Sequence, residues 1–76
     1  MITELQKSIL EFAKHECFKC SLEDFISRTG VDKDEALQAL KDLRSKRIVS
    51  MPPDLMHAFI GVTNYGWSVM QWKRGY

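Results

Sequence analysis

The first half of the chain mixes apolar and polar residues at the spacing of amphipathic helices. In the segment 3–15, four apolar residues fall on one helical face, and Thr3 is a suitable N-cap. That face consists of Leu5, Ile9, Phe12 and Ala13. Leu10 lies off this face, which predicts either a residue at the rim of the core or a contact in a dimer. We therefore expect a first helix from about Thr3 to His15.

Two further helices are expected, joined by a tight turn. Ser21, with an acidic residue three positions later, resembles a capping box that begins the second helix, and Gly30 suits its end. Asp32 then caps a third helix that runs to about Lys46. Its inner face would consist of Ala36, Leu37, Leu40 and Leu43. The short connection 29–32 contains glycine, as the turn of a helix-turn-helix commonly does.

The pattern after residue 47 changes from helical to extended. Segments 48–51 and 56–62 predict a β-hairpin, because the two prolines in 52–54 suit a turn and not a central strand. The short segment 16–20 is a candidate for one more strand of a small sheet. Thr63 then caps a final helix or turn. The sequence therefore predicts a single domain over residues 1–76, of α+β class and mostly α.

This order of elements resembles the winged helix-turn-helix superfamily. The string 21–31 looks like the second helix and turn of that family, and 36–49 looks like its third helix running into the wing. The string Val62-Thr63-Asn64-Tyr65-Gly66 looks like the hydrophobic-Thr-x-x-Gly that leads from the wing into the last helix. The resemblance implies a three-helix core, a small β-hairpin wing and a C-terminal helix or turn.

The resemblance also implies a function, which is binding of double-stranded DNA by a transcriptional or phage-type regulator. In most of the family the third helix enters the major groove, the wing touches the backbone or minor groove, and dimers read two half-sites. The candidate DNA-binding residues are Lys33, Gln38, Lys41, Arg44, Ser45, Lys46 and Arg47. Among them Gln38 is the natural base reader, since glutamine pairs well with adenine, and the cations would contact phosphates.

The distribution of charge is only partly that of a DNA-binding protein. The net charge is +1, but residues 36–76 carry six basic and two acidic side chains, against five and eight in residues 1–35. The outward face of the third helix nevertheless includes Asp34, Glu35 and Asp42, which would repel phosphates. The first two lie in the first helical turn, where negative charge stabilises the helix dipole. The expected tip of the hairpin contains no lysine or arginine.

A second hypothesis is that the fold serves association with a protein partner or a second copy of the chain. The expected contact residues are apolar side chains of the first helix, the hairpin and the C-terminal segment. They are Leu10, Met51, Leu55, Met56, Trp67 and Trp72. The two tryptophans are five positions apart and so do not share a helical face. We expect one to be buried and the other partly exposed, or both to pack as a lid over the first helix.

Cysteine and histidine spacing does not favour a metal site. Cys17 and Cys20 form a C-x-x-C, but the only other nitrogen or sulfur ligands of the usual kind are His15 and His57, and no second closely spaced pair exists. We expect Cys20 to be a small buried apolar residue.

The sequence contains none of the usual signatures of a catalytic or cofactor site. It has no recognisable nucleophile–base arrangement or glycine-rich phosphate loop, so we expect no enzyme activity, cofactor or small-molecule substrate. No apolar run is long enough for a membrane span, and the N-terminus does not resemble a signal peptide. The expected location is the cytoplasm.

Overall fold

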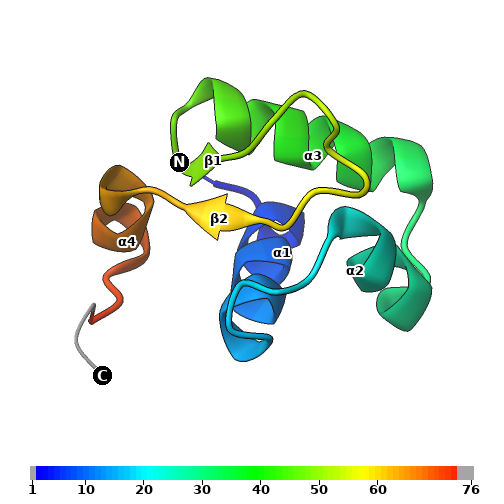
Figure 1. The fold of residues 1–76 in the computed structure, drawn as a ribbon, viewed down its shortest axis with the longest axis horizontal. Helices are drawn as coiled ribbons and strands as arrows, with labels where there is room; N and C mark the ends of the chain where they lie inside the picture. Colours follow the sequence, from blue (N-terminus) through cyan, green and yellow to red (C-terminus); the bar gives the residue numbers. More distant parts are fainter. Residues whose placement is uncertain (1, 74–76) are drawn as a thin grey trace.

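Residues 2–73, which the computed structural model describes, form four helices and one two-stranded hairpin (Figure 1). The order is α1 (Glu4–His15), α2 (Leu22–Thr29), α3 (Lys33–Ser45), β1 (Val49–Ser50), β2 (Gly61–Val62) and α4 (Asn64–Met70). The fold is therefore α+β and mostly helical. The first three helices lie within one or two residues of their predicted bounds, and the final element, expected as a helix or turn, is a helix.

Each helix begins at the N-cap that the sequence predicts. The side-chain oxygens of Thr3, Ser21, Asp32 and Thr63 each accept a hydrogen bond from the backbone N–H three residues later. Such a cap satisfies a backbone donor that has no partner within the helix, and each contributes about 1 kcal/mol.

The helices end in left-handed residues, only one of which is glycine. Gly30 ends α2 with a φ of 72°, as the sequence predicts. Cys17, Arg47 and Gln71 occupy the equivalent left-handed position after the other three helices, with φ between 56° and 62°. After α3, for example, Ile48 N–H donates to the carbonyl of Leu43 at 3.0 Å, which satisfies a carbonyl of the last helical turn.

The predicted strand at residues 16–20 is wrong. Residues 16–18 are instead the turn that closes α1, with Phe18 N–H donating to the carbonyl of Ala13 at 2.8 Å. The left-handed conformation that this bond requires takes Cys17 and Phe18 out of the extended region. One backbone bond, from Ile60 N–H to the carbonyl of Cys20 at 3.0 Å, links this region to the hairpin.

The hairpin has shorter strands than predicted. Val49 pairs with Val62 and Ser50 with Gly61 in an antiparallel register. Residues 55–57 form a turn and not the start of the second strand. The cause is Asp54, whose Oδ1 accepts hydrogen bonds from the backbone N–H groups of residues 56 and 57. We call residues 51–60, which connect the two strands, the hairpin loop.

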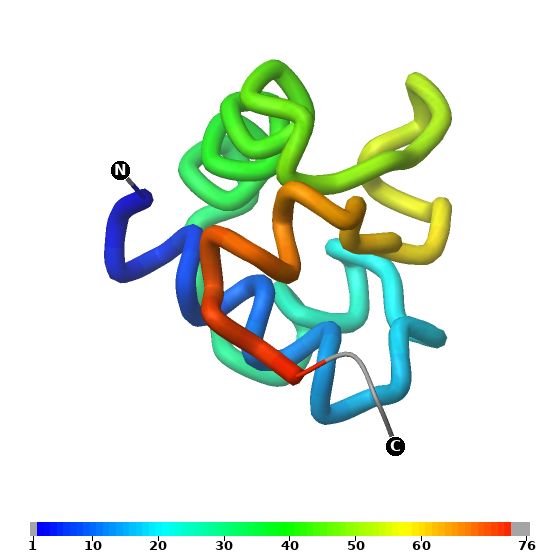
Figure 2. The backbone as a smooth tube through the Cα atoms, turned by 90° about the vertical axis from the view of Figure 1, so that its left-hand side faces the viewer, coloured from blue at the N-terminus to red at the C-terminus, as the bar shows by residue number. Residues whose placement is uncertain are grey.

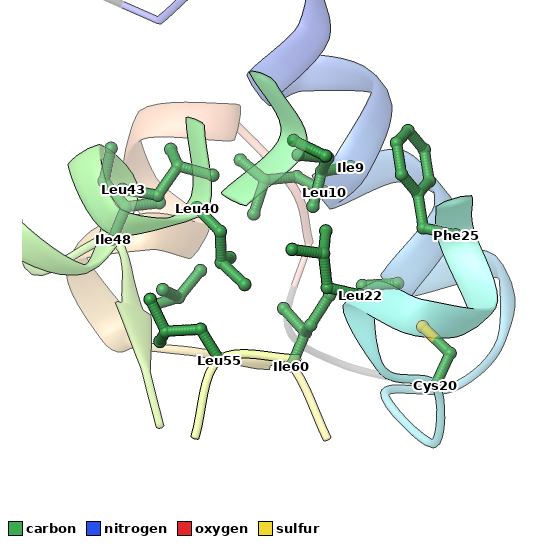
Figure 3. Packing of buried hydrophobic residues seen from close by; sticks show 13 residues of the cluster. Ile9, Leu10, Cys20, Leu22, Phe25, Leu40, Leu43, Ile48, Leu55 and Ile60 are labelled. Carbon is green, nitrogen blue, oxygen red and sulfur yellow. The ribbon is translucent and has the colours of Figure 1, made fainter. Parts of the chain in front are cut away.

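The core lies where α1, α2, α3 and the hairpin loop converge (Figure 3). Leu10 and Leu55 belong to it, with exposed fractions of 0% and 6%. Both were expected as candidate contacts with a partner, and the structure corrects this. Leu10 completes the contact of α1 with the core, and Leu55 extends from the hairpin loop into the same cluster beside α3, because burying an apolar side chain is favourable by about 1.5–3 kcal/mol.

Helix α4 packs closely against the start of the hairpin. Thr63 Oγ1 donates to the carbonyl of Ile48 at 3.1 Å while it caps α4. Gly66 lies so near that a Cβ atom built on it would be 2.3 Å from the Ile48 carbonyl oxygen. The Thr-x-x-Gly spacing therefore has a structural reason. After α4 the chain runs back alongside α1 (Figure 2), where Trp72 Nε1 donates to Glu11 at 3.3 Å.

Candidate nucleic-acid interface

The exposed side chains of α3 divide into two sides with different charge. Lys33, Leu37, Lys41 and Arg44 recur at helical spacing and form one stripe along the helix. Leu37 and Lys41 line a shallow groove of about 250 Å³ with residues 53–56 of the hairpin loop. Arg44 and Arg47 line the adjacent groove with residues of the hairpin strands. We call Lys33, Lys41, Arg44 and Arg47 the basic flank.

The acidic side chains lie toward α1. Thr3, Leu5 and Gln6 of α1 face α3 across a groove of about 540 Å³. On the α3 side this groove is lined by Asp34, Glu35, Gln38, Ala39 and Asp42. We call Asp34, Glu35 and Asp42 the acidic flank. The acids that the sequence places on one broad outward face therefore lie on the side away from the hairpin.

Asp42 is held by two hydrogen bonds. Its Oδ2 accepts one from Gln6 Nε2 at 2.7 Å and one from Lys46 Nζ at 2.9 Å. The bonds from Lys46 and then Gln6 lower the pKa of this carboxyl group below its ordinary value. Lys46, which the sequence groups with the phosphate-binding cations, thus lies beside the acidic flank in an ion pair.

The basic flank lacks such pairing. Among residues 2–73, the ion pairs described involve His15, Arg28, Lys46 and His57 and none of the four cations of the flank. All four of those side chains are exposed. Gln38 and Ser45 are also exposed. Gln38 lines the groove toward α1, one helical turn from both Asp34 and Asp42.

The hairpin loop contributes no cation. Its one acidic residue, Asp54, accepts hydrogen bonds from the backbone and ring of His57, which lower the pKa of the Asp54 carboxyl. His57 Nε2 lies 3.2 Å from Glu23 Oε2, so the histidine links the loop to α2. Among the expected contact residues of this loop, Met51 and Met56 are half-buried.

A separate aromatic cluster joins the end of α1 to α4. Trp67 is buried at 8% exposed, which corrects its expected role as a partner contact, and Trp72 is half-buried. Trp72 also packs over α1 through Lys14 and Glu11, so the structure combines features of both arrangements expected for the tryptophans. Phe18 packs edge-on against Trp67, with ring centroids 5.6 Å apart. The sequence did not predict that Phe18 packs against Trp67, because the left-handed turn that brings Phe18 to α4 contains no glycine that would indicate such a turn. The sequence also did not predict the exposure of Phe59, at 61%; Tyr65, which belongs to the aromatic C-terminal segment, is 58% exposed.

The cysteines and histidines are dispersed. Cys17 is exposed and Cys20 is buried, and burial together with the charge of Asp24 raises the pKa of the Cys20 thiol to about 11. His15 contacts Glu16, whereas His57 contacts Asp54. No group of three or more His, Cys, Asp or Glu side chains in the described part of the chain is placed to hold a metal ion. None of the described helices has the length and apolar character needed to cross a membrane.

Comparison with protein-family models, with curated proteins and with solved structures finds no significant match to this chain. The case for a function therefore depends on the residues and geometry described above.

Proposed function

We propose that this protein is a winged helix-turn-helix domain that binds duplex DNA. Helix α3 would enter the major groove, and the hairpin would lie beside it as the wing. The arrangement supports the proposal, since a tight turn at Gly30 joins α2 to α3 and the hairpin follows α3 directly. The observation that carries the proposal is the separation of charge on α3.

This separation answers the main objection that the sequence raises. Three acids on the surface that meets DNA would repel the phosphates. In the structure they line the groove toward α1, and one of them, Asp42, is neutralised by Lys46. The side of α3 nearest the hairpin carries Lys41 and Arg44 without a partner carboxylate among the described ion pairs. That side is the one on which DNA would contact both α3 and the hairpin.

Reading of bases would fall to the exposed polar side chains on the outer side of α3. Gln38 and Ser45 are exposed there, and a glutamine amide can form two hydrogen bonds with adenine. Gln38 has Asp34 and Asp42 one turn away on either side, which favours contact at one or two base pairs only.

The absence of cations from the hairpin loop limits the number of phosphate contacts. With about four phosphates neutralised by the basic flank, log Kobs would fall with log salt concentration with a slope of about −3.6. We therefore expect weak, strongly salt-dependent binding by one copy of the domain, which two copies on adjacent half-sites would strengthen.

The test is fluorescence anisotropy with a mixed set of labelled duplexes at about 50 mM salt. Lys41→Gln and Arg44→Gln should each weaken binding on every duplex and make the salt slope less steep by about 1. Lys7→Gln is the matched control, because Lys7 is exposed on α1 and lines neither of the grooves that α3 shares with the hairpin. No binding at about 100 μM protein at this salt, or an equal loss in all three variants, would reject the proposal.

Association with a protein partner is the second candidate. The exposure of Phe59 and Tyr65 favours it, since large aromatic side chains are enriched in interfaces. Light scattering during gel filtration should then show a dimer that Phe59→Ser or Tyr65→Ser dissociates. If the protein is a monomer in this experiment, the second candidate function would require a different protein as the partner.

A further inference from the structure

A second concave surface lies between the end of α1 and α4, away from the basic flank. It is a groove of about 580 Å³, within the range of pockets that hold small organic ligands. We call it the aromatic groove. Its lining residues are Lys14, Cys17, Phe18, Trp67, Gln71, Trp72 and Lys73.

The apolar wall of the groove consists of three rings that pack on one another. Trp67 and Trp72 have centroids 5.2 Å apart at an interplanar angle of 75°, and Phe18 lies 6.5 Å from Trp72. At these distances no ligand ring fits between any two of them. Phe18 and Trp72 are half-buried, and Lys14 Nζ lies over the Trp72 ring, so a planar aromatic ligand would contact the parts of these two rings that remain exposed.

The polar part of the groove is positively charged. Lys14 Nζ lies 4.7 Å from the Trp72 ring centroid, and Lys73 is a second lining cation. Within residues 2–73, no acidic side chain lines the groove. Glu16 is paired with His15 and Arg28. Glu11, which accepts from Trp72 Nε1, keeps its charge, so two lysines of the groove stand against this one neighbouring carboxylate. The local charge therefore favours an anion and disfavours a cation.

We propose that the aromatic groove binds a small planar aromatic anion, of the aryl carboxylate class. The ring system lies against Phe18 and Trp72, and the carboxylate accepts from the Lys14 ammonium, with Lys73 adding to the attraction. A bicyclic ring is small enough to enter a groove of about 580 Å³. The proposal is independent of DNA binding, because no residue of the basic flank contributes to it.

The chain offers a clean spectroscopic test. Both of its tryptophans line this groove, so the two indole N–H signals in a ¹H–¹⁵N spectrum both report on it. We expect 2-naphthoate to shift both signals with one saturable Kd at or below about 1 mM, since a ligand of this size gains only a few tenths of a kcal/mol per atom. Backbone signals of β1 and of the basic flank should not move.

A series of ligands and variants tests the charge. The uncharged 2-naphthamide should bind about 3- to 10-fold more weakly than 2-naphthoate, and 2-naphthylmethylammonium more weakly still. Lys14→Gln should remove most of the difference between naphthoate and naphthamide. The matched control is Lys7→Gln, on the same helix and exposed but outside the groove, which should leave both affinities unchanged.

Several outcomes would overturn the inference. One is the absence of any change in either indole signal at about 5 mM 2-naphthoate, which is five times the highest Kd expected. Another is equal binding of the carboxylate and the ammonium, which would reject an anion site. A third is shifts spread evenly over the surface, which would indicate non-specific association. Because Lys14→Gln changes an exposed side chain, its fold is expected to survive, and its retained spectrum verifies this.

Discussion

Gln6 Nε2 in α1 donates a 2.7 Å hydrogen bond to Asp42 Oδ2 in α3. The same amide group donates to the carbonyl of Ala39, and its Oε1 accepts from Thr3 N–H in the capping box of α1. Gln6 is only 3% exposed, so one buried polar side chain both caps α1 and sets the position of α3 against it. The division of α3 into two flanks depends on this contact.

Replacing Gln6 should therefore destabilise the fold more than a typical surface change. We expect Gln6→Ala to lower the free energy of unfolding by about 2–3 kcal/mol, because three hydrogen bonds are lost and buried polar groups are left without partners. Urea denaturation measures this. Ser8→Ala, exposed on the same helix, is the control and should change stability by less than about 0.5 kcal/mol. Equal effects of the two changes would contradict this role of Gln6.

The hydrogen bonds of Asp42 and Asp54 predict a loss of stability in acid. Both carboxyl groups have a lowered pKa in the folded chain, by bonds from Lys46 and Gln6 and from His57 respectively. Their contribution is complete above the unfolded pKa of about 3.9 and is lost as pH falls through the folded values. Between pH 6 and about 2, the free energy of unfolding of the double variant Asp42→Asn/Asp54→Asn should depend less on pH than that of the wild type. Parallel curves would show that these two groups do not contribute.

Gly66 should tolerate no side chain. A Cβ atom there would meet the Ile48 carbonyl oxygen at 2.3 Å, which is backbone and cannot move without separating α4 from the hairpin. We expect Gly66→Ala to lower the free energy of unfolding by at least about 2 kcal/mol. In Gly61→Ala the nearest atom is at 3.2 Å, so a shift of a few tenths of an ångström suffices, and the loss should be under about 1 kcal/mol. Thermal unfolding of both variants decides the comparison, and equal losses would count against it.

Arg47 combines a strained backbone with a place in the basic flank. Its φ of 62° is a conformation that glycine adopts with less strain. Arg47→Gly should thus raise the free energy of unfolding by about 0.5–1 kcal/mol and yet weaken DNA binding. The reverse change at the end of α2, Gly30→Ala, should lower the free energy of unfolding by about 1 kcal/mol. If Arg47→Gly left DNA affinity unchanged while it stabilised the fold, Arg47 would not contact phosphate.

The two cysteines should differ sharply in reactivity. Cys17 is exposed, whereas Cys20 is buried and the pKa of its thiol is about 11, so only about one Cys20 thiol in a thousand is ionised at pH 8. Iodoacetamide should modify Cys17 in the folded chain and Cys20 only after unfolding. Mass spectrometry of the digested protein identifies the modified site. Modification of both residues at similar rates would show that the end of α1 opens readily.

Local signals in the sequence proved dependable, and signals that depend on distant residues did not. The N-caps were predictable because each bond joins residues three positions apart. The strand expected at residues 16–20 failed because Phe18 N–H closes α1 on Ala13, and this left-handed turn uses cysteine and phenylalanine where glycine is usual. Leu10 was open to two interpretations, because helical spacing alone does not say which neighbouring elements cover it.

The sequence by itself determined the positions of the helices, the hairpin and the turn at Gly30, since apolar spacing and capping residues act over a few positions. It also placed Lys41 and Asp42 on the outer half of α3. Only the tertiary structure decided which of these side chains faces the hairpin and which faces α1. The reason is that a helix has an angular pattern but no preferred neighbour until packing, here through Gln6 and the buried core, sets its rotation and contacts.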